Sequence, residues 1–245
     1  MPDGVTQFEF YDSLDLHKPT FPDRTRVQLE LLKAVVHSTP AKPTVLDLGC
    51  GDGRQTVLAR DAIRSGAVVG MDWSSGALGR ASRTAVPFVQ GAIDGRDLPF
   101  RDGAFSTVIF SEVIEHLVDT DHAIAEIGRV LTSGGTLLIS TPNLAAWFNR
   151  LLLLVGVQPV FSEVSRLRVF GRPGTQVAGH LRLFTLRALC ELLRSQGFAV
   201  REVRGAAYHD LPRAARWFDR LVRRWPSLAA VLVVSAVLEA TAPSG

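Results

Sequence analysis

The stretch VLDLGCGDG, residues 45–53, joins an apolar segment to three glycines at alternating positions. Glycine at such a turn lets the backbone pass close to a ligand, because it has no side chain and adopts positive φ readily. Asp47 stands two residues before the first glycine, and a carboxylate there would repel a pyrophosphate. A dinucleotide turn would also have the spacing G-x-G-x-x-G. The turn therefore favours a ligand that carries a positive charge.

Around this turn, short apolar strands alternate with amphipathic helices. Strands are expected at residues 44–49, 67–72, 87–93, 105–111, 136–141, 198–205 and 229–238. Helices are expected at residues 23–38, 54–66, 74–85, 119–135, 144–155, 185–197 and 212–226. This order predicts an α/β fold, a Rossmann-like doubly wound and mostly parallel seven-stranded sheet. Ligands of such sheets bind beyond the carboxyl ends of the strands.

The length of 245 residues suits a single domain, residues 1–245. Apolar residues make up 47% of the chain and charged residues 21%, so a sizeable core is expected. Residues 142–180 interrupt the alternation between the fifth strand and the next helix. Long excursions at the ligand edge of a sheet are often functional, so we expect a substrate lid inserted there.

The charge pattern and the cysteines exclude several classes of protein. The net charge is only +3 and no block of like charge occurs, which argues against a nucleic-acid partner. Cys50 and Cys190 lie far apart in the sequence and make no disulfide framework, which is typical of a protein of the reducing cytoplasm. The apolar stretches at 151–157 and 228–238 fall short of the roughly 18 residues that a membrane span needs. We therefore expect a cytoplasmic protein.

Three further residues at predicted strand ends suit a nucleoside. Asp72 can accept hydrogen bonds from ribose hydroxyls, and Trp73 offers an apolar face to a purine. Asp94 can accept a hydrogen bond from an adenine amino group. Combined with Asp47, this set indicates a nucleoside that carries an ammonium group rather than a phosphate. S-adenosylmethionine meets that description.

The stretches VLDLGCGDG, GMDWS, GAIDGRDLPFRDGAFSTVIFSEVIEHL and LTSGGTLLISTPN together resemble the class I S-adenosylmethionine-dependent methyltransferases, and the resemblance spans residues 24–200 or more. With the residues above, it implies a cofactor site made of Arg26, Asp47, Gly49, Cys50, Gly51, Gly53, Asp72, Trp73, Asp94 and Ser111. Arg26 stands roughly where ubiquinone-pathway relatives place an arginine near the methionine carboxylate. Many relatives have Asp where this chain has Ser106.

The stretch SEVIEHL, residues 111–117, contains the candidates for catalysis. Glu112, Glu115 and His116 can share one face of a helical turn, and His180 lies at the end of the expected lid. Two carboxylates and two imidazoles are suitable ligands for a divalent cation.

This set resembles those of the ubiquinone-biosynthesis catechol O-methyltransferases and the small-RNA 2′-O-methyltransferases. The resemblance implies a cation such as Mg²⁺ that chelates vicinal hydroxyls and lowers the pKa of the nucleophile. Many class I members carry EHL without a known metal. In those, the histidine lines the substrate pocket as a base, or the residues are structural; the sequence leaves these alternatives open.

The apolar stretch NLAAWFNRLLLLVGVQPVF, residues 143–161, disfavours an RNA acceptor. It favours O-methylation of a small aromatic, polyketide or lipid-like acceptor, with C- or N-methylation open. The same stretch could instead pack on the sheet or form a homodimer contact. Tyr11, His17 and Tyr208 could also reach the site if the N-terminal segment folds over it.

The expected helix at 212–226 alternates arginines with tryptophan, phenylalanine and leucine. Such a helix is typical of a peripheral membrane contact, or of a crossover helix with a solvated arginine face, which we favour. Two other classes of protein remain. They are a nicotinamide-dependent oxidoreductase, which Asp47 disfavours, and a non-catalytic nucleoside-binding protein.

Overall fold

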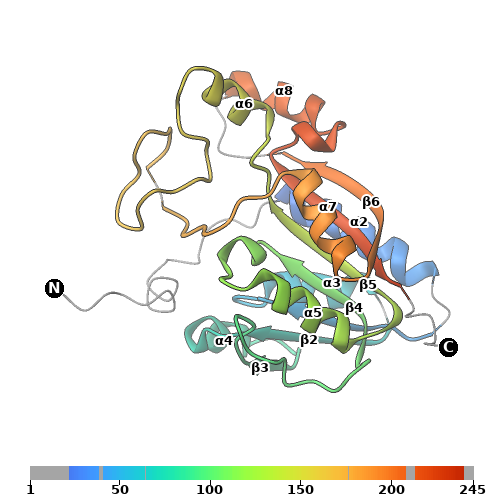
Figure 1. The fold of residues 1–245 in the computed structure, drawn as a ribbon. Helices are drawn as coiled ribbons and strands as arrows, with labels where there is room; N and C mark the ends of the chain where they lie inside the picture. The colour runs from blue at the N-terminus through green and yellow to red at the C-terminus, as the bar shows by residue number, and fades with distance from the viewer. Residues whose placement is uncertain (1–21, 39–40, 64, 176, 208–212, 240–245) are drawn as a thin grey trace.

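The computed structural model describes residues 22–38, 41–63, 65–175, 177–207 and 213–239. Its centre is one seven-stranded sheet with the order β3-β2-β1-β4-β5-β7-β6 (Figure 1). The strands are β1 (Thr44–Leu48), β2 (Ala67–Asp72), β3 (Phe88–Gln90), β4 (Phe105–Ser111), β5 (Leu131–Pro142), β6 (Phe198–Ala206) and β7 (Val231–Leu238). The first five strands pair in parallel, whereas β7 runs antiparallel to both of its neighbours. The predicted doubly wound, mostly parallel sheet is confirmed.

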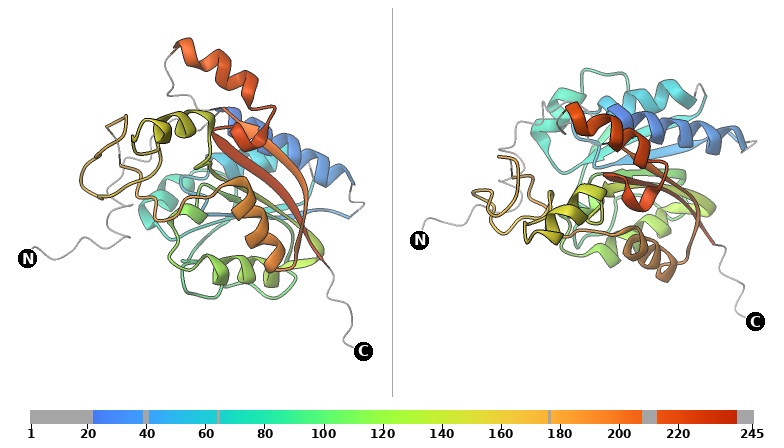
Figure 2. Two further views of the ribbon diagram at one scale, coloured as in Figure 1. Left: turned by 45° about the horizontal axis from the view of Figure 1, so that its top comes forward. Right: turned by 90° about the horizontal axis from the view of Figure 1, so that it is seen from above.

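Helices cover both faces of this sheet (Figure 2). They are α2 (Pro22–Ser38), α3 (Arg54–Ile63), α4 (Ser75–Ala81), α5 (Thr120–Val130), α6 (Trp147–Leu154), α7 (Leu186–Ser195) and α8 (Arg213–Val222), with 3₁₀ turns η1 (Ile114–His116) and η2 (Pro226–Leu228). Helices α2 and α3 pack on one face, in a cluster with Val45 and Ile109. Helices α5 and α7 pack on the other face, in a cluster with Leu46 and Phe110.

The central strand β1 determines where a ligand can bind. It pairs with β2 on one side and with β4 on the other, so the chain reverses its direction of winding between β1 and β4. A crevice forms at such a switch point, beyond the carboxyl ends of the strands. The glycine turn after β1 and the stretch SEVIEHL after β4 both lie at this edge.

Several predicted helices are shorter than expected, α4 and α5 among them. The helix predicted at 119–135 ends at Val130, because Leu131 takes an extended conformation and pairs with Phe105 in the sheet. The helix predicted at 74–85 ends at Ala81. Its expected start is accurate, since Ser74 caps it by accepting a hydrogen bond from the backbone N–H of Ala77.

Between β5 and α7 the chain leaves the sheet and forms the segment 143–185, here called the lid, which contains α6 (Figure 1). Within the described parts of the chain, no helix combines the length and the apolar character that a membrane span requires. Tyr11, His17, Tyr208 and the first residue of the predicted 212–226 helix lie outside the described residues.

Candidate functional site

The glycine turn after β1 is held tightly against the neighbouring strand. The backbone N–H groups of Gly49 and Cys50 both donate to the carbonyl of Met71, at 2.7 and 3.0 Å. Gly49 has φ +78°, and a Cβ atom there would lie 2.3 Å from Cγ2 of Val113. Both the dihedral angle and the space therefore require glycine at this position.

A pocket opens beside this turn, at the carboxyl ends of β1, β2 and β4. Its lining residues come from the glycine turn, the end of β2, the loop after β3 and the turn after β4: Leu48, Gly49, Gly51, Met71, Asp72, Trp73, Ser74, Gly91, Ala92, Ile93, Asp94, Glu112, Val113, His116 and Leu117. Five residues of the predicted cofactor site are among them. The structure therefore brings Gly49, Gly51, Asp72, Trp73 and Asp94 together around one pocket.

The two aspartates of this pocket also organise its walls. Asp72 accepts hydrogen bonds from the backbone N–H groups of Gly51, at 2.7 Å, and Ser74, at 2.9 Å. Asp94 accepts from the N–H groups of Val118 and Asp119, at 3.1 and 3.0 Å. Each carboxylate thus joins a strand end to the loop opposite it.

Asp47 is not among the lining residues of this pocket, and its side chain is buried beneath the glycine turn. The hydroxyl of Thr56 donates to its carboxylate at 2.7 Å. Burial raises the pKa of Asp47 from 3.8 to about 6, although the Thr56 hydrogen bond and the charge of Arg24 oppose this shift. The carboxylate of Asp47 therefore lies below the turn rather than in the pocket wall, and its role toward a ligand stays a prediction.

Arg26 points away from the pocket. It is exposed on α2 and pairs with Asp23 at 2.8 Å and with Glu30 at 2.7 Å. Arg24, two residues earlier, is buried instead, and its charge acts on both Asp47 and Glu115. The arginine close to the site is therefore Arg24, which sequence reasoning missed.

A network of buried and half-buried polar side chains connects Arg24 to the end of β4. Arg24 donates to Gln55 at 2.9 Å, and Gln55 donates to Gln28 at 2.7 Å and to Ser111 at 3.0 Å. The hydroxyl of Ser111 donates to Gln28 at 2.7 Å. Ser111 thus ties α2, α3 and β4 together beside the pocket.

The remaining two residues of the predicted cofactor site pack behind the glycine turn. Cys50 is buried, and burial raises the pKa of its thiol, so it stays a neutral packing group. At Gly53, φ is +76° and a Cβ atom would lie 2.7 Å from the ring of Phe88. Cys50 and Gly53 thus allow the turn to pack closely against β2 and β3.

The turn after β4 begins with an unusual backbone conformation. Glu112 has φ +56°, a left-handed value that is uncommon for a residue other than glycine. Its carboxylate accepts a hydrogen bond from the hydroxyl of Ser140 at 2.8 Å. This conformation directs the chain into the turn η1, which carries Glu115 and His116.

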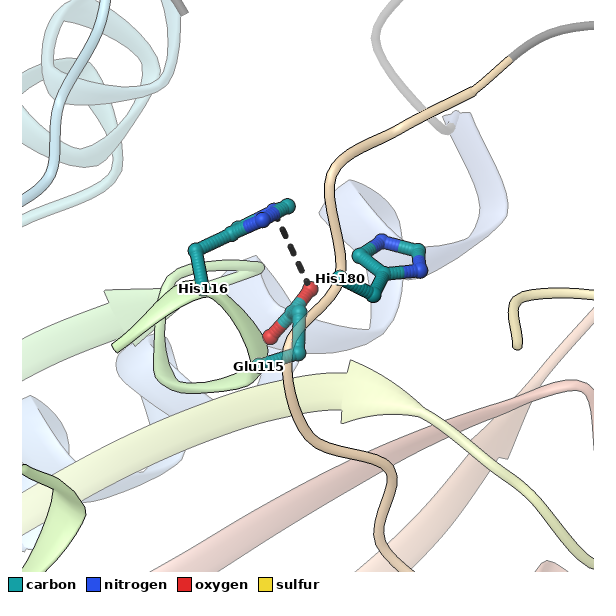
Figure 3. A group of neighbouring side chains, drawn as sticks. All are labelled: Glu115, His116 and His180. Carbon is teal, nitrogen blue, oxygen red and sulfur yellow. Dashed lines mark ion pairs between the residues drawn. The ribbon is translucent and has the colours of Figure 1, made fainter. Parts of the chain in front are cut away.

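Glu115, His116 and His180 gather into one cluster, which we call the Glu–His–His cluster (Figure 3). One potential ligand atom from each side chain lies within 4.8 Å of the others. His116 Nε2 is 3.9 Å from Glu115 Oε1, and the two imidazole centroids are 4.9 Å apart. Glu112, the fourth predicted ligand, is not in this group.

The carboxylate of Glu115 is fully buried and only half satisfied. Oε2 accepts from the hydroxyl of Thr141 at 3.0 Å, whereas Oε1 has no hydrogen-bond partner among the described residues. Burial raises the pKa of Glu115 well above its ordinary value, and the nearby charge of Glu112 adds to this. A buried carboxylate oxygen in this state is suited to a cation or to a donated proton.

Both imidazoles have their tautomer fixed by backbone carbonyls. His116 Nδ1 lies 3.3 Å from the carbonyl of Gly179, and His180 Nδ1 lies 2.9 Å from that of Phe161. A carbonyl only accepts, so Nδ1 carries the proton and Nε2 is the basic nitrogen. Burial lowers the pKa of His116 to about 3, and burial also lowers that of His180. Both rings are therefore neutral near pH 7.

Glu163 holds the lid around this cluster. Its carboxylate accepts from the backbone N–H groups of Ala178 and Gly179, both at 2.6 Å, and of His180 at 3.2 Å. Arg172 pairs with it at 3.1 Å, and the two side chains are only 6% and 5% exposed. Glu163 thereby positions His180 and also the Gly179 carbonyl that faces His116.

Comparison with known proteins agrees with this architecture. The family described as a methyltransferase domain matches residues 23–203, most of the chain. The protein therefore belongs to this methyltransferase family, and the predicted class I methyltransferase fold is confirmed. The cofactor of such domains is S-adenosylmethionine, which agrees with the cofactor predicted from the sequence.

Among the similar proteins is a "Probable S-adenosylmethionine-dependent methyltransferase" of Mycolicibacterium smegmatis, 31% identical over 163 residues, which are 66% of this chain and 54% of that protein. A demethylmenaquinone methyltransferase of Corynebacterium kroppenstedtii is 39% identical over 102 residues, 40% of this chain and 42% of that one. The chain spans about half or less of the length of these relatives.

A solved structure of a Haloferax volcanii methyltransferase, in complex with the Trm112 activator, has the same fold. The TM-score is 0.61 at 21% identity, over 90% of this chain and 94% of that one.

Proposed function

We propose that this protein transfers the methyl group of S-adenosylmethionine to a hydroxyl oxygen of a small aromatic, polyketide or lipid-like acceptor. The observation that carries the proposal is the Glu–His–His cluster, which adjoins the nucleoside pocket through His116. A hydroxyl is a weak nucleophile and needs help in losing its proton, which a neutral imidazole can provide. A plain nucleoside-binding protein would have no use for such a cluster.

The reaction needs alignment and one proton acceptor. The acceptor oxygen attacks the methyl carbon in line with the sulfur, the O–C bond forms, and the S–C bond breaks to release S-adenosylhomocysteine. His116 Nε2 is the candidate acceptor for the hydroxyl proton, because its Nδ1–H is engaged with Gly179, although a pKa lowered by burial to about 3 makes it a weak base near pH 7. His180 lies on the lid side of the cluster, where its backbone N–H donates to Glu163.

The same residues could hold a divalent cation, but two imidazoles and one carboxylate suit Zn²⁺ or Fe²⁺ better than Mg²⁺, which prefers oxygen ligands. Glu115 Oε1 is buried without a hydrogen bond, and the two neutral imidazoles stand beside it, as metal binding requires. A cation held by Glu115, His116 and His180 would lower the pKa of a bound hydroxyl.

The acceptor is proposed to be apolar because apolar side chains flank the cluster on two sides. On the lid side, Phe161 lies 6.2 Å from the ring of His180 and 6.2 Å from that of Phe148. On the pocket side, Val113 and Leu117 line the wall. The name of one relative, demethylmenaquinone methyltransferase, is consistent with an apolar acceptor.

For the cofactor, we propose that Arg24 rather than Arg26 lies near the methionine carboxylate. Arg24 is buried beside Ser111 and Gln55 at the end of β4. We propose that Asp72 accepts hydrogen bonds from the ribose hydroxyls and that Asp94 accepts one from the adenine amino group.

The proposal is tested with labelled S-adenosylmethionine, a panel of phenolic, polyketide and isoprenoid acceptors, and the variants His116→Gln and His37→Gln. His37 is exposed on α2 and serves as the matched control. We expect His116→Gln to lower turnover by roughly 10²–10⁴-fold, with S-adenosylhomocysteine binding retained. Products methylated at nitrogen or carbon, or unchanged turnover in His116→Gln, would contradict it. Loss of turnover on adding EDTA, restored by Zn²⁺, Fe²⁺ or Mg²⁺, would assign the cation.

A further inference from the structure

Exposed apolar side chains are concentrated at one edge of the molecule. They belong to the end of α6, to the lid between residues 164 and 170, to α8 and to the turn after α8: Leu151, Leu153, Leu154, Val155, Val164, Leu167, Phe170, Trp217, Phe218, Leu221 and Trp225. Leu154 is 81% exposed, Leu167 88% and Trp217 64%. Clusters of this kind on a protein surface mark interaction sites.

The helices α6 and α8 form one surface, although about sixty residues separate them in the chain. Trp147 of α6 donates from Nε1 to Asp219 of α8 at 2.8 Å, and its ring lies 4.9 Å from that of Phe218. Both helices and the lid lie beyond the same edge of the sheet (Figures 1 and 2). We call their outer surface the arginine–leucine face.

Among the described residues of the segments that form this face, the exposed ionised side chains are all positive. In the segments 147–171 and 213–228 the only acidic residues are Glu163 and Asp219, and both are buried. The exposed charged residues are arginines: Arg150, Arg166, Arg168, Arg216, Arg220 and Arg224. A partner that covers this face must therefore be negatively charged and must accept aliphatic side chains.

Helix α8 shows this combination within a few turns. Asp219 and Val222 are buried and face the protein. The opposite side presents Trp217 and Leu221 next to Arg220 and Arg224. A helix with aromatic and aliphatic residues beside arginines is suited to the interface of a bilayer, with the apolar groups below the headgroups and the arginines at their level.

We propose that the arginine–leucine face binds the surface of an anionic lipid bilayer. A second copy of this chain fits less well, because a two-fold contact would bring the same positive face against itself. Nucleic acid also fits less well, because its phosphates give no favourable burial to Leu154 or Leu167. The inference does not depend on which acceptor the protein methylates.

Vesicle co-sedimentation of the full chain tests this proposal. The vesicles contain phosphatidylcholine alone or with about one third phosphatidylglycerol, at low and high salt. We expect binding to the anionic vesicles only, weakened by salt. Arg220→Gln/Arg224→Gln should weaken binding about fivefold for each arginine removed, and Leu151→Ser/Leu154→Ser at least about tenfold.

The matched controls carry the same substitutions elsewhere, namely Arg187→Gln on α7 and Leu58→Ser on α3, both exposed. They should bind as the unchanged protein does, and S-adenosylhomocysteine calorimetry checks that every variant is folded. The proposal is overturned by absent binding to anionic vesicles or by undiminished binding of the face variants. A dimer that Leu151→Ser/Leu154→Ser dissociates, without vesicle binding, would overturn it as well, as would binding of nucleic acid instead of vesicles.

Discussion

The glycine turn borders the pocket and the lid borders the Glu–His–His cluster, and the two are built in different ways. Residues 49–53 are fixed by backbone hydrogen bonds to Met71 and by glycines that no other residue can replace without strain. In the lid, residues 163–180 are instead gathered by a buried carboxylate, Glu163, which accepts from three backbone N–H groups and pairs with an arginine. The glycine turn is thus held by local backbone geometry, whereas this part of the lid is held by side-chain contacts.

This contrast predicts that Gly49→Ala has the largest effect. The left-handed φ and the clash with Val113 should lower the free energy of unfolding by about 2–5 kcal/mol. Cofactor affinity should fall on the order of 100-fold, because the turn would move. Gly79→Ala is the control, since Gly79 lies in α4 with no atom within 4 Å of a new Cβ, and it should stabilise slightly. Denaturant unfolding and S-adenosylhomocysteine calorimetry measure both, and a tolerated Gly49→Ala would contradict the rigid-turn description.

Glu163→Gln should separate the two regions. The substitution removes the negative charge that pairs with the buried Arg172. It also weakens the hydrogen bonds that the backbone N–H groups of Gly179 and His180 donate to this side chain. Turnover should fall roughly 10–100-fold, as for residues that orient a reacting group, and the lid should be cleaved faster by protease. Calorimetry should show unchanged S-adenosylhomocysteine binding. Glu191→Gln breaks an exposed pair with Arg187 and should change neither property. Equal losses of turnover and cofactor binding would mean that the two regions are not independent.

Asp47→Asn should change stability by an amount that depends on pH. Because the pKa of Asp47 is about 6 in the folded protein and 3.8 in the reference state, the folded form binds more protons between these values. Asp47 therefore destabilises the fold progressively as pH rises from about 4 to about 6, by up to about 3 kcal/mol at pH 7. The variant should be more stable than the unchanged protein at pH 7, and this gain should shrink toward pH 4 in urea titrations.

The same Asp47→Asn substitution should weaken binding of the cationic S-adenosylmethionine more than that of the uncharged-sulfur product, S-adenosylhomocysteine. Equal losses of affinity for the two molecules would contradict an electrostatic role of Asp47.

The smallest effect is expected for Arg26→Gln. Its two ion pairs are exposed, so stability should change by no more than about 0.5 kcal/mol. Cofactor affinity should remain as it was. Arg24→Gln, two residues away, should weaken cofactor binding about tenfold, as expected for loss of a buried charged contact. If Arg26→Gln has the larger effect on calorimetric affinity, the assignment of Arg24 is wrong.

The helical period could have distinguished these two arginines in advance. Arg24 and Gln28 lie four residues apart on the same face of α2 as Leu31, which is buried, while Arg26 lies opposite with Glu30. The resemblance to relatives across a loop pointed to Arg26, whereas the hydrophobic pattern places Arg24 on the buried face of the helix. The role of Glu163 had no such signal, because its partners are 9 to 17 residues away in an irregular segment.

By itself, the sequence determined the α/β fold, the ligand edge of the sheet, the glycine turn and the proximity of Glu115 to His116. These features follow from period, turn chemistry and short spacings, which act locally. Only the tertiary structure decided that His180 joins that pair while Glu112 stands apart, that Asp47 is buried, and that α6 and α8 share one face. Those outcomes depend on how distant segments pack, since burial sets both the pKa values and the contacts.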